Sequence, residues 1–277
     1  MSRLKTRFDK LRAEGRAALV PYITAGDPRP DWTVLLMHRL VASGADIIEL
    51  GVPFSDPMAD GPVIQAAHER ALRHGVSLRG VLEMVARFRE DDPDTPVVLM
   101  GYQNPMEAIG PETFAQTAAQ AGVDGVLTVD LPPEEGNEIL ECMRASGLDP
   151  IFLVSPTTRE SRIETISRVA GGFVYYVSLK GVTGASTLDI DAVDERLGCI
   201  RHHTQLPVGV GFGISGPEAA ARVGRIADAV VVGSAIVRRV AEHEEDREAM
   251  FDAIGALVSD MRGAIDTARE SGQGATS

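Results

Sequence analysis

Eight short apolar runs recur along the chain, and none of them has a polar face. They span residues 17–24, 46–52, 96–102, 124–130, 150–155, 172–178, 206–213 and 227–234, and they are rich in Val, Ile and Leu. Strands of a parallel sheet that is covered on both faces have this continuous apolar character. The runs therefore predict eight buried parallel strands.

Helical patterns fill the intervals between the runs. One begins after the Pro and Asp residues of 27–31 and ends at Gly44, and others span 77–90, 111–122, 132–147, 158–172 and 215–224. Several of them end at Gly, the usual residue just after a helix C-terminus. Eight strands, each followed by a helix through right-handed crossovers, predict a (β/α)8 TIM barrel.

The barrel is expected to form a single domain over residues 1–268, and residues 269–277 are expected to be a disordered tail. The charged segment 1–19 predicts an extra amphipathic helix before the first strand. A doubly wound open sheet is the competing architecture, but it usually has fewer strands and a GxGxxG fingerprint after the first one. Here the first run leads into "ITAGDPRP" instead. Two connections are unusually long, at 53–76 and 179–190, and both follow strands, where barrel active sites form.

The net charge of −13 argues against nucleic acid or an anionic membrane as the main partner. It does not exclude a phosphorylated ligand, because backbone N–H groups bind phosphate without a basic patch. Cys142 and Cys199 belong to no CxxC or Cys/His cluster, which is typical of a reducing cytoplasm. No apolar run is long enough to cross a bilayer, and the N-terminus lacks the apolar region of a signal peptide.

A carboxylate, Glu49, interrupts the second apolar run, "DIIELGV". Because strand side chains alternate, Ile48 and Leu50 are expected to face the helices, and Glu49 the barrel interior near the strand's C-terminal end. Apolar and aromatic neighbours raise the pKa of such a group toward neutrality, which suits proton transfer. The alternative is a structural glutamate paired with a buried Lys or Arg, although the first five strands offer no basic residue at inward positions.

Two more carboxylates, Asp56 and Asp60, follow in the loop "SDPMADGP" at the rim of the same barrel mouth. Either one reaches a ligand if the loop folds inward. The alternative for both is turn chemistry, because Asp before Pro or Gly favours turns and helix N-caps.

Glycines mark the ends of the last two expected strands. Gly211 and Gly213 end "VGVGFGIS", and Gly233 precedes Ser234 in "VVVGSAIV". Glycine lets backbone N–H groups approach an anion closely, and a helix N-terminus supplies attraction. The pattern predicts a phosphate site with a short extra helix after the eighth strand, as barrels often have. The alternative is that these glycines only permit tight turns.

Seven segments of the sequence, in order, resemble the tryptophan synthase alpha subunit family. They are "PYITAGDP", "IELGVPFSDPMADGPVIQ", "LMGYQNP", "VDGVLTVDLPPEE", "YYVSLKGVTGA", "VGFGIS" and "VVVGSAIV", and they fall within residues 17–240. The carboxylate loop together with "GVTG" and "GFGIS" is specific to this family, because other phosphate-binding barrels share only the glycines.

The resemblance implies a lyase of tryptophan biosynthesis. The family performs the retro-aldol cleavage of indole-3-glycerol phosphate to indole and glyceraldehyde 3-phosphate without a cofactor. By resemblance, Glu49 is the acid/base for the proton at indole C3 and for the glycerol hydroxyl. Asp60 accepts the indole N–H as positive charge develops on the ring, and Tyr175 positions Glu49 or the substrate hydroxyl. Two carboxyl groups in different environments then have two roles.

The resemblance also assigns the rest of the substrate site. Residues matching the indole pocket and the loop that closes over it are Tyr22, Met100, Leu127, Thr183 and Phe212, and those matching the phosphate site are Gly184, Gly213, Gly233 and Ser234. Tyr22 stands where the family usually has Phe. Leu179 stands where some members carry Arg, so the closing contacts of that loop are expected to differ.

A partner is implied as well. The family pairs this subunit with a beta subunit in an alpha2-beta2 complex, and indole passes through a tunnel to the beta subunit's pyridoxal phosphate. The matching contact positions are Asp56, Asn104 and Pro132. No cofactor and no metal are expected in this chain.

Two other function classes remain open at this point. Another phosphate-binding barrel, such as a sugar-phosphate epimerase or isomerase, usually needs metal-binding His/Asp sets or a catalytic Lys or Cys at strand ends. The six histidines (38, 68, 74, 202, 203 and 243) fall in helices or connections and are expected to be mostly solvated. A non-catalytic regulator of another enzyme is favoured only if Glu49 or Asp60 is lost, and both are present.

Overall fold

A computed structural model describes residues 2–178, 189–211 and 213–273 of the chain. Eight parallel strands close into a barrel in chain order, β1 to β8, with β8 paired to β1. The strands are β1 (Ala18–Thr24), β2 (Ile48–Gly51), β3 (Val97–Gly101), β4 (Gly125–Thr128), β5 (Asp149–Val154), β6 (Val174–Val177), β7 (Val208–Gly211) and β8 (Ala229–Val232). The predicted (β/α)8 barrel is confirmed, and each strand lies within one of the apolar runs or overlaps it closely.

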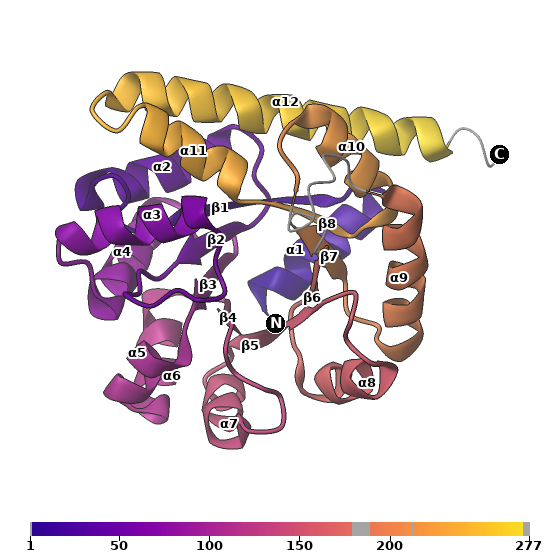
Figure 1. The fold of residues 1–277 in the computed structure, drawn as a ribbon, viewed down its shortest axis with the longest axis horizontal. Helices are drawn as coiled ribbons and strands as arrows, with labels where there is room; N and C mark the ends of the chain where they lie inside the picture. The colour runs from indigo at the N-terminus through magenta and orange to yellow at the C-terminus, as the bar shows by residue number, and fades with distance from the viewer. Residues whose placement is uncertain (1, 179–188, 212, 274–277) are drawn as a thin grey trace.

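The helices other than α1 surround the barrel (Figure 1). They are α1 (Arg3–Ala13), α2 (Pro30–Ala42), α3 (Pro62–Arg73), α4 (Leu78–Asp91), α5 (Gln103–Ile109), α6 (Pro111–Ala121), α7 (Asn137–Ala145), α8 (Glu160–Val169), α9 (Ile190–His203), α10 (Pro217–Ile226), α11 (Ser234–Glu242) and α12 (Arg247–Gln273). The extra N-terminal helix and the short helix after the last strand are both present, as α1 and α11.

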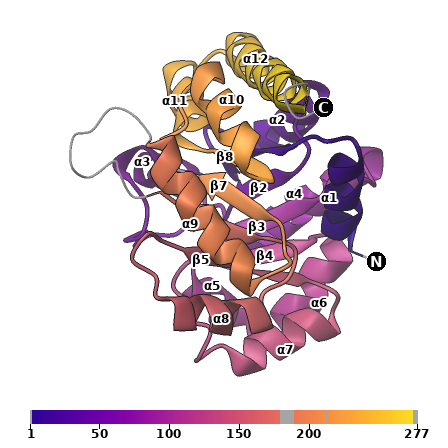
Figure 2. The same ribbon diagram turned by 90° about the vertical axis from the view of Figure 1, so that its right-hand side faces the viewer.

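Two of these helices lie where the sequence analysis expected loops. The 53–76 connection contains α3, which begins with Pro62 at its first turn, and α5 follows β3 directly. The buried residues Ala67, His68 and Ala71 follow the spacing of a helix and give α3 one buried face. At the other end of the chain, α12 continues to Gln273, beyond the boundary expected at residue 268, and packs along α10 and α2 (Figure 2). Arg269 donates from Nε to the backbone oxygen of Gly224, 2.6 Å away.

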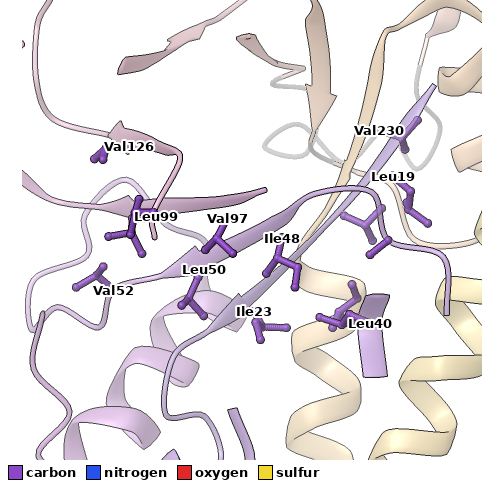
Figure 3. Packing of buried hydrophobic residues seen from close by; sticks show 14 of the residues in the cluster. Leu19, Ile23, Leu40, Ile48, Leu50, Val52, Val97, Leu99, Val126 and Val230 are labelled. Carbon is purple, nitrogen blue, oxygen red and sulfur yellow. The ribbon is translucent and has the colours of Figure 1, made fainter. Parts of the chain in front are cut away.

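The core has two layers separated by the sheet. The outer layer lies between the strands and the helices, and Figure 3 shows Ile23, Ile48 and Leu50 in it with Leu40 of α2. The inner layer fills the barrel with Val20, Ile47, Val98, Leu127, Phe173 and other side chains. Ile48 and Leu50 therefore face outward while Ile47 faces inward, as the strand alternation predicts.

The N-terminal end of the barrel is closed by α1. Leu4, Phe8 and Leu11 of this helix belong to the inner cluster, and a Cβ on Gly125, where β4 begins, would meet Leu4 Cδ1 at 3.0 Å. Packing of this kind leaves no room for a ligand at that end.

Aspartates at the strand starts reinforce the same end. Asp46 accepts a hydrogen bond from the N–H of Leu19 (2.9 Å) and forms an ion pair with Arg262 (2.8 Å). Asp124 likewise accepts from the N–H of Val97 (2.9 Å) and pairs with Arg89 (2.7 Å). These contacts join neighbouring strands and helices, so they reinforce the closed end of the barrel.

Candidate active site

A cavity of about 370 Å³ opens at the C-terminal ends of the strands. Its lining combines two acids, two tyrosines, several apolar side chains and a glycine-rich edge. The lining residues are Tyr22, Glu49, Asp60, Gly61, Pro62, Val63, Ile64, Met100, Tyr175, Gly213, Ile214, Val231, Gly233, Ser234 and Arg238. The acids lie among aromatic and apolar groups, and the glycine-rich edge includes the start of α11, so the cavity has one acidic part and one glycine-rich part.

Glu49 reaches this cavity from β2, where it pairs in register with Tyr22 of β1 and Val98 of β3. The residue is 1% exposed, and its Oε1 atom is buried without a hydrogen-bond partner in the described part of the chain. Burial, together with the nearby negative charge of Asp60, raises the pKa of Glu49 to about 8. Glu49 is thus mainly protonated at pH 7, and it loses its proton as the pH rises through about 8.

Asp60 comes from the loop between β2 and α3, and its side chain is only 7% exposed. The hydroxyl of Tyr102 donates to Asp60 Oδ2 at 2.8 Å, and the backbone N–H of Ala59 donates to the same hydroxyl at 3.1 Å. Burial raises the pKa of Asp60, and the hydrogen bond from Tyr102 opposes that rise. The loop is therefore folded inward, and Asp60 is held in the cavity wall rather than in a solvated turn.

Tyr22 and Tyr175 form the aromatic walls beside Glu49. Each hydroxyl lies directly over a glycine. A Cβ on Gly51 would be 2.2 Å from the Tyr22 hydroxyl oxygen, and a Cβ on Gly211 would be 2.2 Å from the Tyr175 hydroxyl oxygen. Burial raises the pKa of both phenols well above 10, so they stay protonated as potential donors. Glycine at these two positions is therefore a steric requirement of the site.

The glycine-rich part of the cavity is built from the residues that follow β7 and β8. Gly213 has a φ of 75°, a left-handed conformation that favours glycine, and Gly233 directly precedes α11. The first N–H groups of a helix have no intrahelical partner, so those of Ser234 and the next residue are available for an anion at this end. Arg238, one turn further along α11, also lines the cavity and is the only cationic residue of its described lining.

Comparison with known proteins identifies the family. The model of the family described as tryptophan synthase alpha chain matches residues 8–266. A tryptophan synthase alpha chain from Thioalkalivibrio sulfidiphilus is 66% identical over 266 residues, covering 96% of this chain and 100% of that protein. The chain belongs to the tryptophan synthase alpha chain family.

Solved structures agree with this assignment. Tryptophan synthase subunit alpha from Legionella pneumophila superposes with a TM-score of 0.91 at 48% identity, covering 96% of this chain and 99% of that one. A tryptophan synthase complex from Pyrococcus furiosus contains a chain with a TM-score of 0.80 at 38% identity, covering 90% of this chain and 98% of that one. The chain is accordingly the lyase of tryptophan synthase, which cleaves indole-3-glycerol phosphate to indole and glyceraldehyde 3-phosphate.

The other residues expected from the tryptophan synthase alpha family are placed as follows. Met100 lines the cavity, whereas Leu127 is fully buried in the inner barrel layer and is not part of the lining. The interface residues expected for the family differ in exposure: Asp56 and Asn104 are exposed, and Pro132 is half-buried. Thr183, Gly184, Phe212 and the atypical Leu179 lie outside the described residues.

Two residues of the site were missed by the sequence analysis. The expectation that the histidines are mostly solvated is wrong for His68, which is 3% exposed and has its Nε2 atom 3.6 Å from Asp60 Oδ2. The signal was available in the helical spacing of Ala67, His68 and Ala71 after Pro62. Arg238 was missed because an arginine on a helix is ordinarily solvent-exposed, and nothing in the surrounding residues indicates that this one lines the cavity.

Among the residues that the structure describes, no group of three or more His, Cys, Asp or Glu side chains is placed to bind a metal ion. No helix in the described ranges has the length and apolar character needed to cross a membrane.

Proposed function

We propose that Glu49 and Asp60 divide the cleavage of indole-3-glycerol phosphate between them, with Glu49 transferring protons and Asp60 binding the indole N–H. The observation that carries the proposal is the isolation of Glu49. Its carboxyl group is 1% exposed, faces no basic residue among the described neighbours, and has a pKa of about 8. A structural glutamate paired with Lys or Arg would have the opposite shift.

The proton transfers balance as follows. Protonated Glu49 gives its proton to indole C3, which leaves positive charge at the ring nitrogen. The Glu49 carboxylate then takes the proton of the hydroxyl on the carbon attached to C3. As that carbon becomes the aldehyde of glyceraldehyde 3-phosphate, the electron pair of the broken carbon–carbon bond returns to the ring. Indole is released, and Glu49 has regained its proton.

Asp60 is proposed to balance the transient ring charge. An aspartate that accepts the ring N–H binds the indole more strongly as positive charge grows on the ring. It therefore stabilises the transition state more than the bound substrate. Asp60 is suited to this because the Tyr102 hydroxyl contacts Oδ2. In the described part of the chain no donor binds Oδ1, which leaves this atom for the indole N–H. Tyr175 is proposed to orient Glu49 or the substrate hydroxyl.

The phosphate is proposed to bind at the start of α11, through Gly213, Gly233 and Ser234. The chain carries a net charge of −13, and Glu49 and Asp60 lie in the same cavity. A positive charge nearby would add to the attraction that the backbone N–H groups supply for a dianion. Arg238 supplies it, because long helical side chains lean toward the helix N-terminus, where Ser234 lies. Thr183, Gly184 and Phe212 stay predictions for the same substrate.

The partner is proposed to be a tryptophan synthase beta subunit in an alpha2-beta2 complex, with pyridoxal phosphate bound in the beta subunit. Support comes from the family and from the solved complex of Pyrococcus furiosus. The exposed positions of Asp56, in the loop that carries Asp60, and of Asn104, near the start of α5, suit such a contact. Both cysteines are free, which supports a cytoplasmic location.

An indole-release assay with indole-3-glycerol phosphate, with and without a beta subunit, tests this assignment. Glu49→Gln and Asp60→Asn are isosteric, and each is expected to reduce kcat by about 10²–10⁴-fold while the fold is retained. Glu83→Gln, at an exposed position of α4, is the matched control and should keep full activity. Normal turnover by a folded Glu49→Gln enzyme would rule out the proposed proton transfer.

A further inference from the structure

A buried histidine contacts the loop that carries Asp60. His68 lies on α3, and its Nδ1 atom accepts a hydrogen bond of 2.9 Å from the backbone N–H of Phe54. A neutral imidazole whose Nδ1 accepts a hydrogen bond carries its proton on Nε2. That nitrogen is 3.6 Å from Asp60 Oδ2 and has no other partner among the described residues. An unsatisfied buried N–H is uncommon and calls for a physical reason.

We propose that His68 is a positioning residue for the reaction: its Nε2–H donates to Oδ2 of Asp60 and, with the Tyr102 hydroxyl, holds the carboxylate so that Oδ1 meets the indole N–H. This inference rests on the role of Asp60 proposed above. Two donors on one oxygen fix the rotation of a carboxylate and leave its second oxygen free.

The distance of 3.6 Å is about 0.4 Å beyond the upper end of the range for N–H···O hydrogen bonds. Catalytic hydrogen bonds are often long in structures without a ligand and shorten when the substrate binds. A small rotation of the Asp60 side chain would close this gap. Both partners are buried, at 3% and 7% side-chain exposure, so water competes little for the contact.

The charge state of His68 is part of the argument. Burial lowers the pKa of His68 to about 4, so the ring is neutral at pH 7. A cationic histidine would neutralise Asp60 and weaken its attraction for positive charge on the indole ring. A neutral N–H donor orients the carboxylate while leaving its negative charge available.

The surroundings hold His68 rigidly enough for this role. Phe54, whose N–H fixes the histidine tautomer, stacks on Tyr102 with ring centroids 4.9 Å apart. Two residues after His68, Arg70 forms a bidentate salt bridge with the buried Asp27. Its Nε and Nη2 atoms lie 2.7 and 2.8 Å from the two carboxylate oxygens. The helix is thus fixed to the loop after β1, and the histidine does not depend on Asp60 for its position.

Two substitutions separate a positioning role from a purely structural one. Both His68→Leu and His68→Gln remove the imidazole ring, and both are assayed as folded protein, so a loss that came only from the missing ring would lower kcat equally in the two variants. Only glutamine places an N–H donor near the position of Nε2. We expect His68→Leu to lower kcat about 10-fold or more, as for loss of a hydrogen bond to a charged group, with a smaller change in KM. His68→Gln should restore kcat to within about 3-fold of the wild type.

Equal kcat values for folded Leu and Gln variants, or wild-type kcat in His68→Leu, would overturn the proposal. Should the Leu variant not fold, ¹⁵N NMR of the wild-type ring gives a second measurement. It should show a neutral Nε2–H tautomer at pH 7 whose resonance moves in Asp60→Asn, and a protonated ring or an Nδ1–H tautomer would contradict the inference. An active Asp60→Asn enzyme, by contrast, would refute the role of Asp60 itself.

Discussion

The buried carboxyl group of Glu49 should make the native protein less stable than its amide variant at neutral and alkaline pH. An unfolded glutamate has a pKa near 4.5, whereas folded Glu49 has a pKa of about 8. Below pH 4.5 both states are protonated, and ionisation of this residue costs the native state nothing. As the pH rises from 4.5 to 8, the unfolded chain releases the proton and the native chain keeps it, so native stability falls.

The magnitude follows from the two pKa values. Each pH unit in this interval is worth about 1.4 kcal/mol. Relative to acid pH, the loss reaches about 2 kcal/mol at pH 6, about 3 kcal/mol at pH 7 and about 5 kcal/mol above pH 8. Glu49→Gln keeps the size and neutral polarity of the protonated acid and has no proton to lose. It should therefore be more stable than the wild type by these amounts, which are large against typical total stabilities.

Urea unfolding at pH 6, 7, 8 and 9, with the free energy of unfolding extrapolated to water, measures this difference. The advantage of Glu49→Gln should increase with pH and level off above pH 8. Glu83→Gln, which changes an exposed glutamate of α4, is the control and should stay within about 0.5 kcal/mol of the wild type. A Glu49→Gln advantage that is absent, or constant across the four pH values, would refute the view that this carboxyl is buried without a compensating partner.

Three further outcomes are expected. Because Glu49 must be protonated to supply the first proton, kcat/KM should fall as the pH rises through about 8, and a profile flat to pH 9 would contradict this. Arg238→Gln should raise KM for the phosphorylated substrate about 10-fold with little change in kcat. The control is Arg239→Gln, which should leave KM unchanged because the Arg239 guanidinium binds the backbone of its own helix. Gly211→Ala places a methyl group 2.2 Å from the Tyr175 hydroxyl oxygen, so it should lower kcat at least 10-fold in a folded protein, and wild-type kcat would show that the tyrosine adapts.

Much of the catalytic end of the barrel was predictable from local patterns. The two-residue period of a strand is enough to separate Ile48 and Leu50 from Glu49, and Gly213 and Gly233, which follow the last two strands, line the cavity. These inferences succeed because alternation and turn chemistry depend on neighbouring residues only. Leu127 shows the limit, since it belongs to the inner layer as alternation predicts, but alternation does not say whether an inward side chain reaches the cavity lining.

The position of the 53–61 loop required the tertiary structure. Asp60 carried the same turn signals as Asp56, yet one is buried against the Tyr102 hydroxyl and the other is exposed. The contact that distinguishes them joins residues 42 positions apart. No local pattern encodes such a contact, because it forms only when the barrel closes and brings the ends of β2 and β3 together.

The sequence by itself determined the eight strands, the inward direction of Glu49 and the glycine-lined edge, since each follows from periodicity or backbone freedom over a few residues. Only the tertiary structure decided that His68 is buried beside Asp60, that Arg238 borders the cavity, and that Glu49 has no basic neighbour among the described residues. The physical reason is that burial and pKa depend on every group packed around a side chain, and in a barrel those groups come from distant parts of the chain.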